Sequence, residues 1–226
     1  MTTDGPFVPQ FGGGFARFLY PIVDTGVCNA KHLDPVALAE AYLGGGARIL
    51  QLRDKNASSA ESLALADRIV ERASHHAAVV IVNDRADIAR LSGAAGVHVG
   101  QDDLGMPDVR RLVGPAFIVG ISTHDEPQID EALASDATYV AVGPVFDTAT
   151  KETGYAARGL DLVRYAANRG KPVVAIGGIT VERAASVLEA GATGLAVITD
   201  LLNGTDPGNR SREFIARVAA WDPPTR

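Results

Sequence analysis

The sequence predicts a single-domain α/β protein folded as a (β/α)8 TIM barrel, and three observations support this prediction. Eight short runs rich in valine, isoleucine and alanine are each followed by a segment with the spacing or capping residues of a helix. No linker or shift in composition divides these repeats. Small residues lead into three strands in a similar way, in GGARILQL, GAAGVHVG and GATGLAVI. Such alternation is typical of a parallel barrel, whereas the alternative, an open doubly wound sheet, more often has fewer strands.

The predicted elements follow one another along nearly the whole chain. Residues 1–17 are rich in glycine, proline and polar side chains, so we expect a flexible N-terminal arm before a barrel domain of residues 18–226. The expected strands are residues 18–24, 47–53, 79–83, 96–100, 117–122, 139–143, 172–177 and 194–199. The expected helices are residues 35–44, 60–75, 85–91, 107–113, 126–134, 160–169, 181–190 and 211–220, with Asp34, Ser58 or Ser59, and Thr180 as caps.

Composition narrows the class of protein. The chain has 226 residues, 46% of them hydrophobic, which is enough for a large core. Its one cysteine, Cys28, excludes an intramolecular disulfide and suits a reducing cytoplasm, and the N-terminus lacks the pattern of a signal peptide. No apolar run approaches the roughly 20 residues of a membrane span. The net charge of −6 argues against broad nucleic-acid binding. We therefore expect a cytoplasmic protein that binds neither nucleic acid nor membrane.

Two neighbouring strands end in carboxylates, at the end of the barrel where active sites lie. Asp84 follows the apolar run at residues 79–82, and Asp102 and Asp103 follow the strand at residues 96–100. Magnesium takes one or two protein carboxylates and leaves positions free for phosphate oxygens. The pattern therefore indicates a divalent-cation site. The alternative is that these acids cap the following helices.

Cationic and hydroxyl side chains follow the other strands. Gln51, Arg53 and Lys55 alternate along the second strand, so they share a side that suits phosphate oxygens. The alternative is a surface row of ion pairs with Asp54 and Asp84. The polar loop at residues 143–151 carries Thr148, Thr150 and Lys151, which would form an anion cradle on a mobile lid or, alternatively, a plain solvent loop.

The last two strands predict a phosphate pocket. Gly177 and Gly178 end the seventh strand, and Ile198 and Thr199 end the eighth. Loops in these positions bind phosphate through backbone N–H groups in many barrels, and glycine allows close approach. His98 is expected to pack inside the barrel. No His or Cys spacing of a zinc site is present.

These motifs together resemble the thiamine-phosphate synthase family, also called thiamine-phosphate pyrophosphorylase, from about residue 19 to residue 218. The resemblance is carried by QLRDK (51–55), NDRADIA (83–89), GVHVGQDDL (96–104), GIS (120–122) with His124, GPVFDTATK (143–151) and AIGGI (175–179). It implies a transferase on a TIM barrel that uses Mg²⁺. The reaction joins a hydroxymethylpyrimidine diphosphate to a thiazole phosphate, giving thiamine phosphate and pyrophosphate.

The resemblance also implies a role for each matching residue. Its metal ligands fall on Asp84 and Asp103, and its catalytic residues on Arg53, Ser122 and Lys151. The pyrimidine diphosphate site falls on Gln51, Leu52, Arg53, Asp54, Lys55, Asn83, Ser122 and Lys151. The thiazole phosphate site falls on Thr148, Ala149, Thr150, Gly178, Ile198 and Thr199. One departure is visible: Thr199, Asp200 and Leu201 replace the family's Ser-Ala-Ile type sequence, so Asp200 would bring a negative charge near the phosphate pocket.

The expected mechanism needs charge stabilisation rather than a general base. Magnesium, Arg53, Lys55 and Lys151 would neutralise the departing pyrophosphate, and the thiazole nitrogen would capture the pyrimidine methylene cation. The expected partners are small phosphorylated substrates. The sequence is also compatible with a homo-oligomer. Two alternatives to this function are a related thiazole tautomerase, which needs no diphosphate, and a non-catalytic phosphate-binding barrel.

Overall fold

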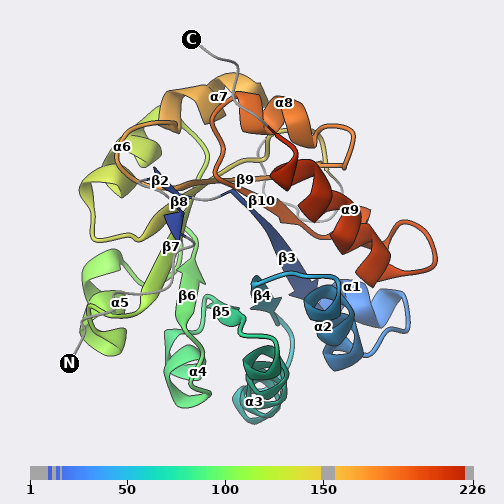
Figure 1. The fold of residues 1–226 in the computed structure, drawn as a ribbon. Helices are drawn as coiled ribbons and strands as arrows, with labels where there is room; N and C mark the ends of the chain where they lie inside the picture. Colours follow the sequence, from blue (N-terminus) through green and yellow to red (C-terminus); the bar gives the residue numbers. More distant parts are fainter. Residues whose placement is uncertain (1–9, 12–13, 16, 149–155, 222–226) are drawn as a thin grey trace.

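The computed structural model describes residues 10–11, 14–15, 17–148 and 156–221, and its main feature is a closed barrel of parallel strands. The strands lie in the order β10-β3-β4-β5-β6-β7-β8-β9, and helices form a ring around them (Figure 1). The barrel strands are β3 (Phe18–Asp24), β4 (Ile49–Arg53), β5 (Val79–Asn83), β6 (Gly96–Val99), β7 (Ile118–Thr123), β8 (Tyr139–Val142), β9 (Val173–Ile176) and β10 (Gly194–Val197). The predicted TIM barrel is therefore confirmed.

The helices follow the strands, as predicted, with one addition at the start. They are α1 (Thr25–Ala30), α2 (Pro35–Gly44), α3 (Ser59–His75), α4 (Ala86–Leu91), α5 (Met106–Val113), α6 (Glu126–Ala134), α7 (Gly159–Ala166), α8 (Ala184–Glu189) and α9 (Pro207–Ala219). A short 3-10 helix, η1 (Thr199–Leu202), follows β10. None of the helices in the described part of the chain combines the length and apolar character needed to cross a bilayer.

The predicted N-terminal arm falls partly outside the described residues, at 1–9, 12–13 and 16. Two short strands from this region, β1 (Gln10–Phe11) and β2 (Gly14–Phe15), pair in antiparallel fashion. Arg17 then places its guanidinium carbon 3.7 Å from the centre of the Trp221 ring. This cation–π contact joins the segment before β3 to the residue that follows α9.

Strand alternation divides the core into two layers. Inward-facing side chains such as Tyr20, Ile81 and Tyr139 fill the barrel, and Val23 and Leu50 pack between the strands and the helices. Tyr20 and Leu50 are both at most 1% exposed. Because successive residues of a strand point to opposite faces, both layers are built from the same short runs. The barrel is therefore a packed scaffold that leaves its polar strand ends for the site.

Capping side chains explain where two of the predicted helices, α2 and α3, begin. Asp34 accepts hydrogen bonds from the backbone N–H groups of Val36 and Ala37, and Ser58 forms a reciprocal capping box with Glu61. Thr180 is different. Its hydroxyl accepts from the Arg183 N–H within a turn, and α8 begins only at Ala184, so the predicted cap does not start this helix.

Candidate functional site

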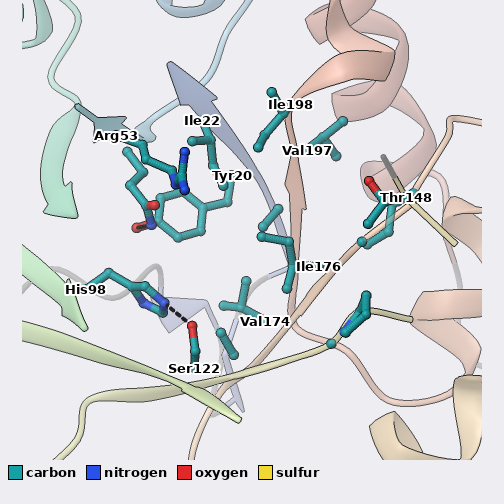
Figure 2. Close-up of a pocket in the computed structure, with 18 of the residues that line it drawn as sticks. Tyr20, Ile22, Arg53, His98, Ser122, Thr148, Val174, Ile176, Val197 and Ile198 are labelled. Carbon is teal, nitrogen blue, oxygen red and sulfur yellow. Dashed lines mark hydrogen bonds between the residues drawn. The ribbon is translucent and has the colours of Figure 1, made fainter. Parts of the chain in front are cut away.

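A pocket opens at the carboxyl ends of the barrel strands, where the sequence predicted the site (Figure 2). The predicted site residues that line it are Gln51, Arg53, Asn83, Ser122, Thr148, Gly178, Ile198 and Thr199. Gly177, which the sequence predicted for the phosphate pocket together with Gly178, also lines it. The further lining residues were not predicted individually to bind a ligand: Tyr20, Ile22, His98, Thr123, His124, Ala141, Gly143, Pro144, Val174, Ile176, Ile179, Ala196 and Val197. Lys55, Asp54, Asp84 and Asp103 lie outside this lining.

A chain of hydrogen-bonding side chains crosses the inside of the barrel below the pocket. Gln51 Nε2 donates to Tyr20 Oη at 3.1 Å, and the Tyr20 and Tyr139 hydroxyls lie 3.0 Å apart. His98 continues the chain, with Nδ1 2.9 Å from Tyr139 Oη and Nε2 2.9 Å from Ser122 Oγ. Burial raises the pKa of both tyrosines well above the ordinary value, so their hydroxyls stay protonated. The chain fixes Gln51 and Ser122 toward the pocket.

His98 is thus a packed barrel residue, as the sequence predicted, and it also orients Ser122 (Figure 2). His124 lines the pocket from the loop after β7. Its Nδ1 lies 2.5 Å from the carbonyl oxygen of Gly143, which can only accept, so Nδ1 carries the proton. The alternation of side chains along the first predicted strand could have indicated that Tyr20 and Ile22 line the pocket, because both occupy inward positions of that strand.

Arg53 is held at the pocket wall by a buried carboxylate. Its Nη1 donates to Asp24 Oδ2 at 2.5 Å, and Asp24 is only 4% exposed. The other oxygen, Oδ1, accepts from the Val27 N–H at 3.0 Å and caps α1. Asp24 therefore fixes the end of β4 relative to the end of β3. A guanidinium held in one orientation is suited to a phosphate or diphosphate group.

Leu52 and Asp54 alternate with the pocket residues and face the other way. Leu52 is buried in the layer between the strands and the helices. Asp54 accepts hydrogen bonds from Thr25 Oγ1 at 2.8 Å and Ser62 Oγ at 2.6 Å. The resemblance places both residues in the diphosphate site, but their side chains are directed away from this pocket. A contact with a ligand there would therefore come from the backbone.

Asp84 and Asp103 come together at the rim, as the sequence predicted. Lys55 Nζ pairs with Asp84 Oδ2, and Asp103 Oδ2 accepts from the Gly100 N–H at 2.7 Å. Burial raises the pKa of the Asp84 carboxyl and the adjacent Asp103 carboxylate raises it further, whereas Lys55 lowers it. A cation at this point would relieve the repulsion between the two carboxylates.

The alternative in which these acids cap helices is wrong. The N-cap of α4 is Arg85 and that of α5 is Gly105, and neither helix has a side-chain cap. The ion-pair alternative is present in part, because Lys55 does pair with Asp84. Within the described residues, His, Cys, Asp and Glu nowhere form a group of three that could hold a metal. The donor set of two carboxylates fits Mg²⁺, which takes its other ligands from water and phosphate.

The opposite side of the pocket is built from backbone. Gly177 and Gly178 have φ values of 103° and 60°, in the left-handed region that favours glycine. A Cβ on Gly178 would lie 2.6 Å from the Asp147 carbonyl oxygen, and one on Gly177 would lie 2.7 Å from Pro144. Ile198 and Thr199 line the same side. The loop after β8 adds Thr148, while Ala149, Thr150 and Lys151 lie outside the described residues.

The sequence predicted that Asp200 would bring negative charge to this pocket, but its carboxylate pairs with a residue outside the pocket. Asp200 is buried but does not line the pocket, and its carboxylate lies 2.9 Å from Arg210 Nη2. The negative charge is therefore compensated by a guanidinium on α9.

Comparisons with known proteins show which proteins the chain resembles. The chain matches the family described as thiamine monophosphate synthase over residues 19–201. It is 40% identical over 205 residues to the thiamine-phosphate synthase of Acidothermus cellulolyticus, covering 89% of this chain and 95% of that one. It is 46% identical over 175 residues to the enzyme of Anaeromyxobacter dehalogenans, covering 77% and 78%. The thiamine phosphate pyrophosphorylase structure from Pyrococcus furiosus superposes with a TM-score of 0.81 at 30% identity, covering 89% and 95%. The chain belongs to the thiamine monophosphate synthase family.

Proposed function

We propose that this chain joins a hydroxymethylpyrimidine diphosphate to a thiazole phosphate, forming thiamine phosphate and releasing pyrophosphate. The observation that carries the proposal is that one pocket has two different anion-binding sides. Arg53 approaches it from β4, and Gly178 and Thr199 approach it from the ends of β9 and β10. A reaction between two phosphorylated molecules requires such a pair of sites around a shared centre.

The diphosphate belongs on the side of β4, β5 and β6. Arg53 is already oriented there by Asp24, and Lys55 lies beside Asp84. Asp84 and Asp103 would hold Mg²⁺, which supplies positive charge to the diphosphate oxygens when bound. Lys55 would then pair with the diphosphate rather than with Asp84. Lys151, from the loop after β8, completes the set in this proposal.

The pyrimidine ring belongs above the barrel interior. Gln51, Asn83 and Ser122 offer amide and hydroxyl groups there, and His98 holds Ser122 in place. Ile22 and Ala141 supply apolar surface for the flat ring. A few fixed polar groups on an apolar surface orient a heterocycle without a strong charge.

The thiazole phosphate belongs on the side of β9 and β10. Gly178, Ile198 and Thr199 line that side, and Thr148 adds a hydroxyl from the neighbouring loop. Their backbone groups would bind the phosphate and leave the thiazole ring directed toward the centre of the pocket.

In the reaction, the bond between the pyrimidine methylene carbon and the diphosphate oxygen breaks, and the electron pair leaves with pyrophosphate. The lone pair of the thiazole nitrogen then forms the new carbon–nitrogen bond, giving a thiazolium ring. Neither step requires a proton transfer. Arg53, Lys55 and Lys151 contribute by stabilising the negative charge that collects on the leaving group, which lowers the barrier more than it strengthens binding.

Incubation of the purified protein with both substrates and Mg²⁺ tests the function, with thiamine phosphate and pyrophosphate measured as they form. We expect equal amounts of both products, and loss of both after chelation of the metal. Conversion of a thiazole substrate without any pyrimidine diphosphate would instead favour a tautomerase. Binding of both ligands without products would favour a non-catalytic barrel. The cytoplasmic location and the absence of nucleic-acid and membrane partners stay predictions from the sequence.

A further inference from the structure

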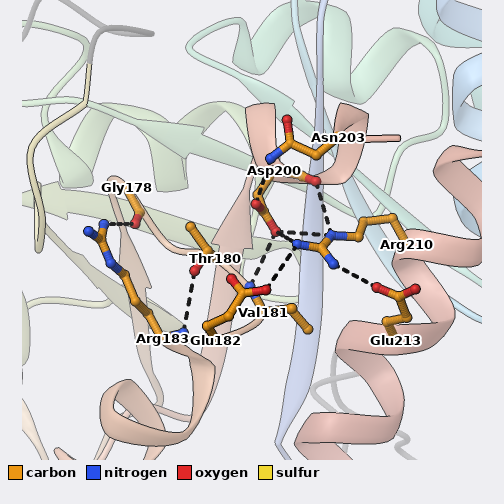
Figure 3. A network of polar contacts seen from close by, with 9 residues as sticks. All are labelled: Gly178, Thr180, Val181, Glu182, Arg183, Asp200, Asn203, Arg210 and Glu213. Atoms are coloured by element: carbon orange, nitrogen blue, oxygen red, sulfur yellow. Dashed lines mark hydrogen bonds and ion pairs between the residues drawn. The ribbon is translucent and has the colours of Figure 1, made fainter. Parts of the chain in front are cut away.

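A buried carboxylate beside the phosphate side of the pocket has no place in the proposed reaction. Asp200 is 5% exposed and lies in η1, directly after Thr199 (Figure 3). Its Oδ2 accepts hydrogen bonds from Arg210 Nη2 at 2.9 Å, Arg210 Nε at 3.2 Å and the Val181 N–H at 3.2 Å. Its Oδ1 accepts from Asn203 Nδ2 at 2.8 Å. Both oxygens are thus used within the protein.

These contacts join the two backbone segments that form the phosphate side. Val181 belongs to the turn that follows Gly178, and Asp200 follows Thr199. One carboxylate therefore connects the segment after β9 with the segment after β10. Arg210, on α9, fixes that carboxylate from the outer side (Figure 3).

A second contact holds the segment after β9 from its other end. Arg183 Nη1 donates to the Gly178 carbonyl oxygen at 2.8 Å. The Arg183 guanidinium carbon lies 4.5 Å from the centre of the Phe146 ring. Gly178 is thus held by Arg183, which itself packs on Phe146 of the loop after β8. The β9–β10 ladder ends at Ile176 and Ala196, and beyond it the hydrogen bond from the Val181 N–H to Asp200 joins the segment of Gly178 to that of Thr199.

The separation of these segments matters because backbone N–H groups cannot adjust as side chains do. A phosphate held by two segments binds well only if both are already in place, since ordering them during binding costs affinity. We infer that Asp200, held by Arg210, is a positioning residue that sets the two backbone segments of the thiazole phosphate site. The inference rests on the proposed function for the identity of the phosphate ligand.

The first test is the variant Asp200→Ala, with Michaelis constants measured for each substrate. We expect the KM for the thiazole phosphate to rise roughly tenfold, the equivalent of one lost hydrogen bond to a charged group. The KM for the pyrimidine diphosphate and kcat at saturation should change less than about twofold, because Asp200 touches neither the reacting atoms nor the diphosphate side. Asp200→Asn keeps an acceptor for the Val181 N–H but loses the charge, so its effect should be intermediate.

Glu213→Gln is the matched control. Glu213 Oε2 lies 2.6 Å from Arg210 Nη1, so this variant also removes a charged partner of Arg210. Glu213 is exposed on α9 and pairs with Arg210 rather than with either phosphate segment (Figure 3). Both Michaelis constants should match those of the unaltered protein.

Three results would overturn the inference: an unchanged KM for the thiazole phosphate in folded Asp200→Ala, an equal rise for both substrates, or the same rise in Glu213→Gln. If Asp200→Ala does not fold, an unchanged KM in Asp200→Asn would overturn it. Titration calorimetry with inorganic phosphate separates this inference from the proposed function. If the unaltered protein makes no thiamine phosphate, the function is wrong. Weaker phosphate binding by the Asp200 variants would still support the positioning role, and equal binding would refute it.

Discussion

The two proposed anion-binding sides of the pocket are built in different ways. The proposed diphosphate side combines Arg53, which lines the pocket, with Lys55, Asp84 and Asp103 at its rim. Each described cation on this side already has a carboxylate partner. The phosphate side consists of Gly177, Gly178, Ile198 and Thr199, whose backbone is shaped by left-handed glycines. Charged side chains can follow a group whose charge grows as it leaves. In the proposed reaction, the backbone side holds a phosphate that takes no part in the bond breaking.

This comparison predicts different kinetic effects on the two sides. Changes on the diphosphate side should lower kcat, because the charges there stabilise the transition state more than the bound substrate. Changes on the phosphate side should raise one KM and leave kcat nearly unchanged. The predictions below test this division, beginning with the largest expected effect.

Asp103→Asn should have the largest effect. Asparagine keeps one oxygen but removes the negative charge that would hold Mg²⁺, so we expect activity at low magnesium to fall by roughly a hundredfold or more. The half-saturating magnesium concentration should rise. The melting temperature should hardly change, because Asp103 is exposed at a strand end. A magnesium titration of activity is the measurement, and an unaltered titration curve would show that Asp103 is not a ligand.

Lys151→Ala should lower turnover on the order of a hundredfold while weakening diphosphate binding less, because its charge is needed most as the carbon–oxygen bond breaks. Single-turnover product formation at saturating substrates, compared with a binding titration, separates the two effects. Lys151→Arg should recover only part of the loss, since a planar fork replaces a compact ammonium. Unchanged turnover with weakened binding would make Lys151 an anchor rather than a catalytic residue.

Asp24→Asn should reduce kcat about tenfold, because Arg53 loses the charged partner that orients it. The asparagine oxygen can still accept from the Val27 N–H, so α1 should keep its cap. Asp34→Asn is a matched control, since Asp34 caps α2 through the Val36 and Ala37 N–H groups, whereas Arg53 pairs with Asp24. Steady-state kinetics of both variants test this. Similar kcat values for the two would mean that Asp24 only supports the fold.

The fold could be predicted from sequence because its signals are local. An apolar β-branched run followed by a capped amphipathic segment specifies each strand–helix pair, and the first strand was predicted at its exact bounds, Phe18–Asp24. Helix α1 was missed because Thr25–Ala30 is short and has no apolar stripe. The start of α8 was misplaced because a threonine that closes a turn has the same sequence signal as an N-cap.

The site was predictable to the extent that it depends on charged side chains. Arg53, Asp84 and Asp103 could be identified because alternation and strand ends fix where they lie. The partner of Arg53 could not be identified, because its pairing with Asp24 depends on the register between β3 and β4. The ion pair between Asp200 and Arg210 could not be predicted either, because it joins η1 and α9 through a tertiary contact that no local sequence pattern specifies.

Thr148→Ala should have the smallest effect and the most selective one. Thr148 lines the pocket next to the phosphate side, and we expect its hydroxyl to donate one hydrogen bond to the thiazole phosphate. Thr148 is only half-buried, so water can replace part of that bond once the hydroxyl is removed. Loss of such a bond corresponds to a rise in KM of roughly threefold. The KM for the pyrimidine diphosphate and kcat should stay unchanged, and Thr148→Ser should restore the original KM because it returns the hydroxyl. Initial rates with each substrate varied in turn provide the measurement. If only the KM for the pyrimidine diphosphate rose, Thr148 would belong to the diphosphate side. The loop that follows β8 would then contribute to the diphosphate side rather than to the phosphate side.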